Sequence, residues 1–210
     1  QKRREKNKNY KVGRKAPRLN RAYEFNSPEE EKENKYAQLV RLTEYLDHLP
    51  LLQLSLESVE ADDIIAWLVH CGEYADWQKL IISNDRDFIQ LCDDKTVLVR
   101  PGKNEEVLNQ NKVLEQYNIH PRNFAWARAI TGDKSDNLEG VKGLGLATVA
   151  KRFSFLSENK DYGLKDIMTH AKNNSSKIKA YQNVLDNEEI IASNYDIMQL
   201  YTTVISPQGV

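Results

Sequence analysis

The sequence predicts an α/β protein in which a parallel sheet flanked by helices is followed by a helical C-terminal part. Short runs at 52–56, 79–82 and 96–100 alternate or are wholly apolar, which predicts strands. Segments of helical periodicity separate these runs, and this alternation is typical of a parallel sheet. From 146 to 204 the pattern is helical, interrupted by short polar loops.

The first predicted elements are a long helix, a strand and a second helix. Ser27 has the chemistry of an N-cap and Pro28 suits the first helical position, whereas Pro50 ends the helix. Leu52–Leu56 alternates leucine with polar residues and predicts a strand. Glu60–Val69 has helical spacing and predicts the second helix.

The remaining elements before the glycine-rich segment follow in quick succession. Lys79–Ile82 is a short apolar run that predicts a buried parallel strand. A helix is expected over Asp87–Cys92 and another strand over Thr96–Arg100. Two further helices are expected, over Gln110–Tyr117 and Pro121–Thr131.

The composition excludes several classes of protein. The chain has 210 residues, of which 40% are hydrophobic and 29% charged, enough for a domain of ordinary size with a real core. No apolar run approaches the roughly 18 residues that a membrane span needs. The N-terminus also lacks the apolar stretch of a signal peptide, so we expect a cytoplasmic protein without a membrane partner.

The net charge of −1 hides a strong asymmetry along the chain. Residues 1–22 carry ten basic side chains and one acid, a net of +9, which leaves −10 for the other 188 residues. A basic N-terminal arm (residues 1–22) on an acidic remainder is expected if the arm binds phosphates while the acids surround metal ions. A solvated tail is the alternative interpretation of the arm.

Three acidic clusters lie where predicted elements begin or end. Glu60, Asp62 and Asp63 stand at the start of a helix, and Glu60 and Asp63 share one helical face. Acids at this position are also common for a simpler reason, since they complement the helix dipole.

The other two clusters are Asp85 with Asp87, directly after the strand at 79–82, and Asp133 with Asp136, after a helix. Ligands of open α/β sheets bind beyond the carboxyl ends of parallel strands, which is where Asp85 and Asp87 fall. An Asx-turn with an N-cap would explain the second cluster structurally, and an ordinary turn would explain the third.

Together the clusters favour metal binding, because seven carboxylates brought together without cations would repel one another strongly. Oxygen ligands without His or Cys suit Mg²⁺ or Mn²⁺ rather than zinc. Two such ions about 4 Å apart can activate water and hold a scissile phosphate. None of the histidines (His48, His70, His120 and His170) stands beside an acidic pair.

A glycine-rich turn follows the third cluster and precedes a helix. Glycines two apart before a helix let phosphate oxygens approach backbone N–H groups, and Lys142, Lys151 and Arg152 add positive charge. Such a turn fixes a protein on DNA without reading its sequence. The turn consists of Gly140, Val141, Lys142, Gly143, Leu144 and Gly145.

At this point the sequence closely resembles the 5′-3′ exonuclease and flap endonuclease family, which includes the nuclease domain of bacterial DNA polymerase I, phage 5′ nucleases and phage ribonuclease H. The matching strings are Tyr10-Lys11-x-x-Arg14, Glu60-Ala61-Asp62-Asp63, Ser83-Asn84-Asp85-Arg86-Asp87-Phe88-Ile89-Gln90-Leu91, Gly132-Asp133-Lys134-Ser135-Asp136-Asn137 and the glycine-rich turn with Thr148.

The resemblance implies a PIN-like parallel sheet, a helical arch and a helix–3-turn–helix. It implies that one metal ion is bound at or near Glu60, Asp62, Asp63, Asp85 and Asp87, and the other near Asp133 and Asp136. Lys11 and Arg14 would steer the scissile phosphate. The glycine-rich turn would hold the uncleaved duplex, and its backbone carbonyls would bind K⁺. The resemblance also implies DNA contacts by Arg3, Arg4, Tyr10, Thr148 and Lys151.

On this basis we expect residues 1–26 to form a basic arch segment, 27–131 the nuclease core, and 132–210 the helix–3-turn–helix and C-terminal helices. The expected substrates are branched or 5′-ended DNA and RNA–DNA hybrids, cut in primer removal by a monomer. A single-stranded-DNA-binding protein or a polymerase is a candidate partner.

Two departures from the family and two other functions also follow from the sequence. Ala147 stands where many relatives have a lysine. Relatives also carry one aspartate on the first strand and another shortly before the Arg-Arg that resembles Arg3-Arg4, and neither is in this sequence. We therefore expect another polypeptide to supply that region, or the sequence to be incomplete. The alternatives are a branched-DNA-binding fragment that does not cut, and an α/β phosphatase of another class.

Overall fold

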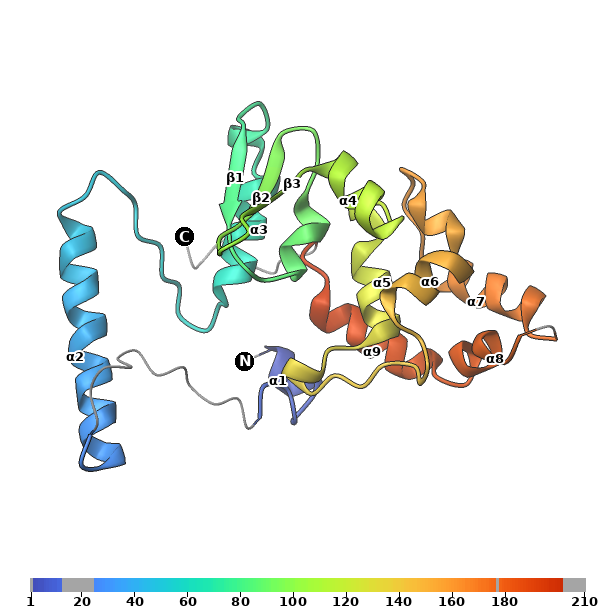
Figure 1. The fold of residues 1–210 in the computed structure, drawn as a ribbon, viewed down its shortest axis with the longest axis horizontal. Coiled ribbons are helices and arrows are strands. Elements are labelled where there is room, and N and C mark those ends of the chain that lie inside the picture. Colours follow the sequence, from blue (N-terminus) through green and yellow to red (C-terminus); the bar gives the residue numbers. More distant parts are fainter. Residues whose placement is uncertain (1, 13–24, 177, 202–210) are drawn as a thin grey trace. The chain divides into compact units, whose positions relative to one another are not determined.

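The computed structural model describes residues 2–12, 25–176 and 178–201 (Figure 1). The chain divides into two compact units, one formed by residues 1–12 and 58–210 and the other by residues 13–57. The smaller unit is therefore an insertion in the sequence of the larger one. The division predicted at 26 and 131 separates functional regions rather than compact units, and it stays a prediction.

The described part of the smaller unit contains one helix, α2 (Pro28–Asp47). The Ser27 hydroxyl accepts a hydrogen bond from the Glu30 N–H at 3.1 Å, which confirms the predicted N-cap. No residue of α2 is buried. The strand predicted at Leu52–Leu56 is wrong: this stretch is irregular and Leu52 is 80% exposed. An alternating pattern forms a strand only beside a pairing partner, and no described strand pairs with this stretch.

The larger unit contains a three-stranded sheet in the order β1-β2-β3. Strand β1 (Lys79–Ile82) runs parallel to β2 (Thr96–Arg100), which confirms two predicted strands. Strand β3 (Glu106–Leu108) pairs antiparallel with β2 and was not predicted. Three residues are too few for an alternating pattern to be recognised.

The two faces of this sheet differ in burial. Ile81, Leu98 and Leu108 lie opposite one another on neighbouring strands and are buried on one face. Leu80 and Ile82 point to the other face and are 66% and 72% exposed. The strand predicted at 79–82 is thus parallel as expected, but its predicted burial is wrong for the face that carries Leu80 and Ile82.

Helices form the rest of the larger unit, and they confirm the helices predicted at 60–69, 110–117 and 121–131. The segment predicted as a helix at 87–92 is a 3-10 turn, η2 (Asp87–Leu91). The α-helices are α1 (Lys2–Lys6), α3 (Ala61–His70), α4 (Gln110–Tyr117), α5 (Phe124–Thr131), α6 (Leu146–Arg152), α7 (Leu164–Asn174), α8 (Lys179–Leu185) and α9 (Glu188–Met198). The other 3-10 turns are η1 (Gly72–Tyr74), η3 (Pro121–Asn123), η4 (Lys134–Asp136) and η5 (Ser154–Ser157).

Helix α5 lies at the centre of this unit and packs against α9 (Figure 1). The Trp126 ring of α5 stacks on the Tyr195 ring of α9, with centroids 3.6 Å apart and planes 8° apart. The buried Asn194 amide donates hydrogen bonds to the carbonyls of Ala129 at 3.0 Å and Glu139 at 2.7 Å. Helix α9 therefore fixes both ends of the loop that carries the third acidic cluster.

Candidate metal centre

Arg3, on α1, is tied to the first acidic cluster. Its Nη1 lies 2.5 Å from Glu60 Oε2 and its Nη2 lies 2.9 Å from Asp63 Oδ1. Its Nε also donates to the Ile197 carbonyl at 2.8 Å, which anchors the guanidinium to α9. Arg3 was predicted to contact DNA, and the structure instead places it between two predicted metal ligands.

Lys11 also pairs with an acid of the first cluster. Its Nζ lies 3.3 Å from Glu60 Oε2 and 4.9 Å from the centroid of the Tyr10 ring. Burial would raise the pKa of Glu60, but Arg3 and Lys11 together lower it below its ordinary value. The Tyr10 ring is buried, and burial raises the pKa of its hydroxyl to about 12. Tyr10 is thus a packing residue that positions Lys11.

Asp62 and Asp85 form the next part of the acidic region. Asp62 does not share the Arg3 pairing of its neighbours, and its pKa is raised by burial and then by the negative charge of Asp85. Asp85 is exposed, and its carboxylate accepts a hydrogen bond from the Asp87 N–H at 2.9 Å. The first and second clusters therefore lie close enough for their carboxylates to interact electrostatically.

Asp87 and Asp133 are joined by Arg128 of α5, a residue that was not predicted to be part of the site. Arg128 Nη2 lies 2.5 Å from Asp133 Oδ2 and 3.2 Å from Asp87 Oδ1, and Nε lies 3.3 Å from the same Asp87 oxygen. Burial raises the pKa of Asp87 to about 6, because the opposing effect of Arg128 is outweighed. Arg128 is the single charged residue of α5, in which every other residue except Thr131 is apolar, and this is the signal that could have revealed it.

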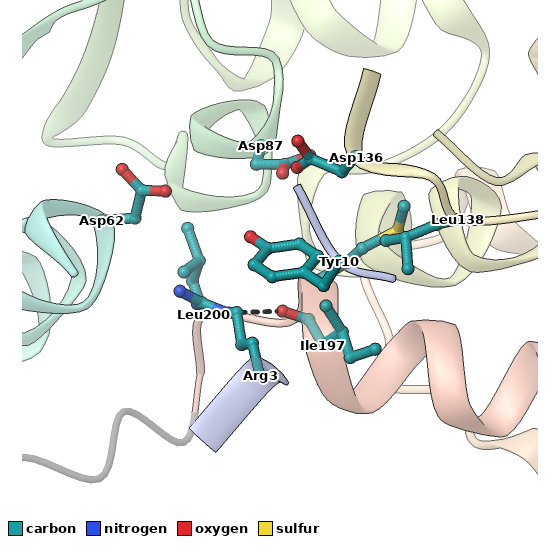
Figure 2. A pocket seen from close by; sticks show the side chains of 9 residues that line it. Arg3, Tyr10, Asp62, Asp87, Asp136, Leu138, Ile197 and Leu200 are labelled. Carbon is teal, nitrogen blue, oxygen red and sulfur yellow. Dashed lines mark hydrogen bonds between the residues drawn. The ribbon is translucent and has the colours of Figure 1, made fainter. Parts of the chain in front are cut away.

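Asp136 completes the region from the turn η4. It is 7% exposed and lines a pocket together with Asp62 and Asp87, so that one carboxylate comes from each predicted cluster. Figure 2 shows Asp87 and Asp136 at one side of this pocket, with Asp62 across from them and Arg3 and Tyr10 beneath.

The acids that line this pocket have the donor chemistry of a hard divalent cation, which is oxygen alone. Within residues 2–12, 25–176 and 178–201, however, no group of three His, Cys, Asp or Glu residues is close enough to hold a metal ion. Arg3 and Arg128 instead tie four of the seven predicted acids into two pairs. The structure thus brings the acids into one region without arranging them as a ready ligand set.

The loop from Gly132 to Gly140 is closed by very tight backbone packing. A Cβ added at Gly140 would lie 2.0 Å from the Thr131 carbonyl oxygen, and one added at Gly132 would lie 2.4 Å from the Gly140 nitrogen. Backbone hydrogen bonds link Asp133 and Leu138 at 2.8 Å in both directions. These glycines therefore allow the close approach that holds Asp133 and Asp136 on one loop.

The glycine-rich turn lines a wide groove together with residues of α9 and the N-terminal segment. Gly143 has φ of +83°, a conformation that favours glycine. The Val141 and Leu144 side chains are buried in the core, and their backbone N–H groups donate to the carbonyls of Ile130 and Val141. Lys142 and Lys151 are exposed, Thr148 is half-buried, and Arg4 on α1 is exposed. Arg14 lies outside the described residues.

Comparison with known proteins identifies the family. Residues 1–118 match the family model described as 5′-3′ exonuclease, N-terminal resolvase-like domain. The chain belongs to the 5′-3′ exonuclease family. This match covers the N-terminal segment, the first two acidic clusters and the whole sheet.

Relatives of the chain include a 5′-3′ exonuclease and a DNA polymerase I. The chain is 34% identical over 154 residues to the 5′-3′ exonuclease of Buchnera aphidicola, covering 70% of this chain and 53% of that protein. It is 34% identical over 146 residues to DNA polymerase I of Mycobacterium bovis, covering 68% of this chain and 16% of that protein. The chain thus spans about half or less of the length of these two relatives.

Solved structures share the fold of this 5′-3′ exonuclease family member. The T5 5′-exonuclease with bound zinc ions superimposes with a TM-score of 0.73 at 23% identity, covering 95% of this chain and 70% of that one. A bacteriophage T5 flap endonuclease in complex with DNA and metal ions gives a TM-score of 0.66 at 22% identity, with the same coverage. These likenesses confirm the predicted α/β architecture of a small sheet flanked by helices.

Proposed function

We propose that the protein is a structure-specific 5′ nuclease that hydrolyses phosphodiesters at the 5′ ends or flaps of DNA or RNA–DNA strands. The observation that carries this proposal is the pocket lined by Asp62, Asp87 and Asp136, which come from three separate elements in a member of the 5′-3′ exonuclease family. Ordinary caps and turns explain each acid singly, but they do not explain why all three face one pocket.

Two divalent ions, Mg²⁺ or Mn²⁺, suit this donor set because all its ligand atoms are hard oxygens. Asp62, Asp85 and Asp87 would hold one ion, and Asp133 and Asp136 the other. When bound, such ions supply an activated water and stabilise the charge on the phosphate. Asp87, with its raised pKa, gives up its proton at neutral pH, which keeps the site anionic when the ions arrive.

The surrounding residues would position the nucleic acid. Lys11 stands beside Glu60 at the edge of the acidic region, where its ammonium can meet a phosphate oxygen. The groove at the glycine-rich turn offers backbone N–H groups and the exposed Lys142 to the uncleaved duplex. A bound K⁺ at the turn, a monomeric state, and a single-stranded-DNA-binding protein or polymerase as partner are parts of the same proposal.

The direct test replaces one acid on each side of the site. The double variant Asp85→Asn with Asp133→Asn is expected to lose about 100-fold or more of Mg²⁺-dependent cleavage of a 5′-labelled flap substrate. Asp76→Asn is the matched control, because Asp76 is an exposed acid that pairs with Lys95 at 2.7 Å and belongs to none of the three acidic clusters. Full cleavage by the double variant would rule out the proposal.

One observation favours a second function, which is DNA binding without cleavage. Among the described residues, no three acids lie close enough together to hold a metal ion. In this alternative the protein binds branched DNA through its basic residues and turn but does not cut it. Flap binding that weakens steeply with salt, together with no turnover in Mg²⁺ or Mn²⁺, would distinguish this function from the nuclease.

A further inference from the structure

Arg128 occupies an unusual place between two acids that belong to different parts of the chain. Asp87 begins the 3-10 turn after β1, and Asp133 follows α5. The Arg128 side chain is 12% exposed and reaches both carboxylates from the last turn of α5. Within the described residues its guanidinium donates three hydrogen bonds, all of them to these two acids.

Arg128 differs in this respect from Arg3, which bridges Glu60 and Asp63. Arg3 also donates to the Ile197 carbonyl, so part of its role is to fasten α1 to α9. The Arg128 guanidinium binds carboxylates that the proposed function assigns to two metal ions. A guanidinium and a divalent ion compete for the same carboxylate oxygens, because each binds the oxygen lone pairs and each neutralises the negative charge of the carboxylate.

We propose that Arg128 is a positioning residue that acts as the internal counter-ion of the metal centre. It holds Asp87 and Asp133 together when no divalent ion is bound, and it lowers the affinity of the site for the ion that displaces its contacts. The inference rests on the proposed metal-dependent function and adds a regulator of metal affinity to it. The same side chain therefore stabilises the metal-free protein and opposes metal binding.

The test compares the wild-type protein with Arg128→Gln, after metal has been removed from both. Mn²⁺ binding is measured by titration calorimetry, and thermal unfolding is followed with and without Mn²⁺. We expect Arg128→Gln to unfold at a lower temperature without metal and to bind Mn²⁺ roughly tenfold more tightly. The stabilisation that Mn²⁺ gives must then be larger in the variant, because binding to the folded state alone raises its stability.

Arg122→Gln is the matched control, since Arg122 forms an exposed pair with Asp161 at 2.9 Å. It is expected to leave Mn²⁺ affinity unchanged. Arg128→Gln combined with Asp87→Asn removes the repulsion between the two acids, so metal-free stability is expected to recover. Arg128→Lys keeps a positive charge beside both acids and all the proposed ligands, and its Mn²⁺ affinity is expected to lie between those of the wild type and Arg128→Gln, which keeps the proposal testable if Arg128→Gln alone folds poorly.

Two results would overturn the inference in distinguishable ways. If wild type binds Mn²⁺ and Arg128→Gln binds it equally well or more weakly, Arg128 is only a structural ion pair and the proposed function stands. If wild type binds no Mn²⁺, the proposed metal chemistry and the competition both fail together.

Discussion

At the scale of single residues, the acids of the site are held in place by two arginine side chains, Arg3 and Arg128. The positions of the acids could be predicted, because strand ends and helix starts can be recognised from local sequence. The pairing of Arg3 with Glu60 and of Arg128 with Asp87 could not be predicted, since the partners are 57 and 41 residues apart. Which arginine meets which acid depends on how α1 and α5 pack, and that is a property of the tertiary structure.

Asp87 gives a prediction for the dependence of stability on pH. Its pKa is raised from 3.8 to about 6, so the folded protein binds its proton more tightly than the unfolded chain does. The free energy of unfolding of the metal-free protein should therefore fall by about 2 kcal/mol as the pH rises from about 4 to about 6. Urea unfolding across this interval should show a flatter profile for Asp87→Asn. A constant difference between variant and wild type would contradict the assignment.

At the scale of elements, cap chemistry and apolar runs predicted most of the helices and both parallel strands. Ser27 and Pro28 began α2 as expected, and the run at 79–82 formed β1. The prediction failed at Leu52–Leu56, where alternation had no neighbouring strand to pair with, and at β3, which is only three residues long. Local sequence specifies a tendency, and the presence of a pairing strand decides whether it is realised.

The loop that carries Asp133 and Asp136 provides a prediction at this scale. Gly140→Ala would place a methyl group 2.0 Å from the Thr131 carbonyl oxygen, and a backbone contact has little freedom to give way. We expect a loss of roughly 3 kcal/mol in the free energy of unfolding. Gly145→Ala in the same turn meets no atom within 4 Å and should cost less than about 1 kcal/mol. Equal losses in chemical denaturation would show that close packing at Gly140 is not the cause.

At the scale of the whole molecule, the first residues of the chain belong to the same unit as the last described helix. Residues 1–12 and 58–210 form this unit, and 13–57 are inserted between them. Arg3 binds the Ile197 carbonyl, and the Tyr10 ring packs in a small buried cluster with Leu138, Ile197 and Met198. The N-terminal segment is therefore held by contacts that do not depend on the continuity of the inserted unit.

Limited proteolysis tests this arrangement. Trypsin should cut first in α2, where no residue is buried, for example at Lys35 or Arg41. The two fragments should still elute together in size-exclusion chromatography under native conditions and separate in denaturant. Release of the N-terminal fragment without denaturant would contradict the packing of Arg3 and Tyr10 on α9.

The uneven burial of the sheet also bears on how the protein behaves in concentrated solution. Strand β1 lies at the edge of the described sheet, and its exposed Leu80 and Ile82 share a face with Val99 of β2 and the exposed Val107 of β3. An apolar face next to a strand edge can template pairing with another chain. We therefore expect β1 to be one place where two copies of the chain can associate at high concentration, at a distance in sequence from the acids of the third cluster.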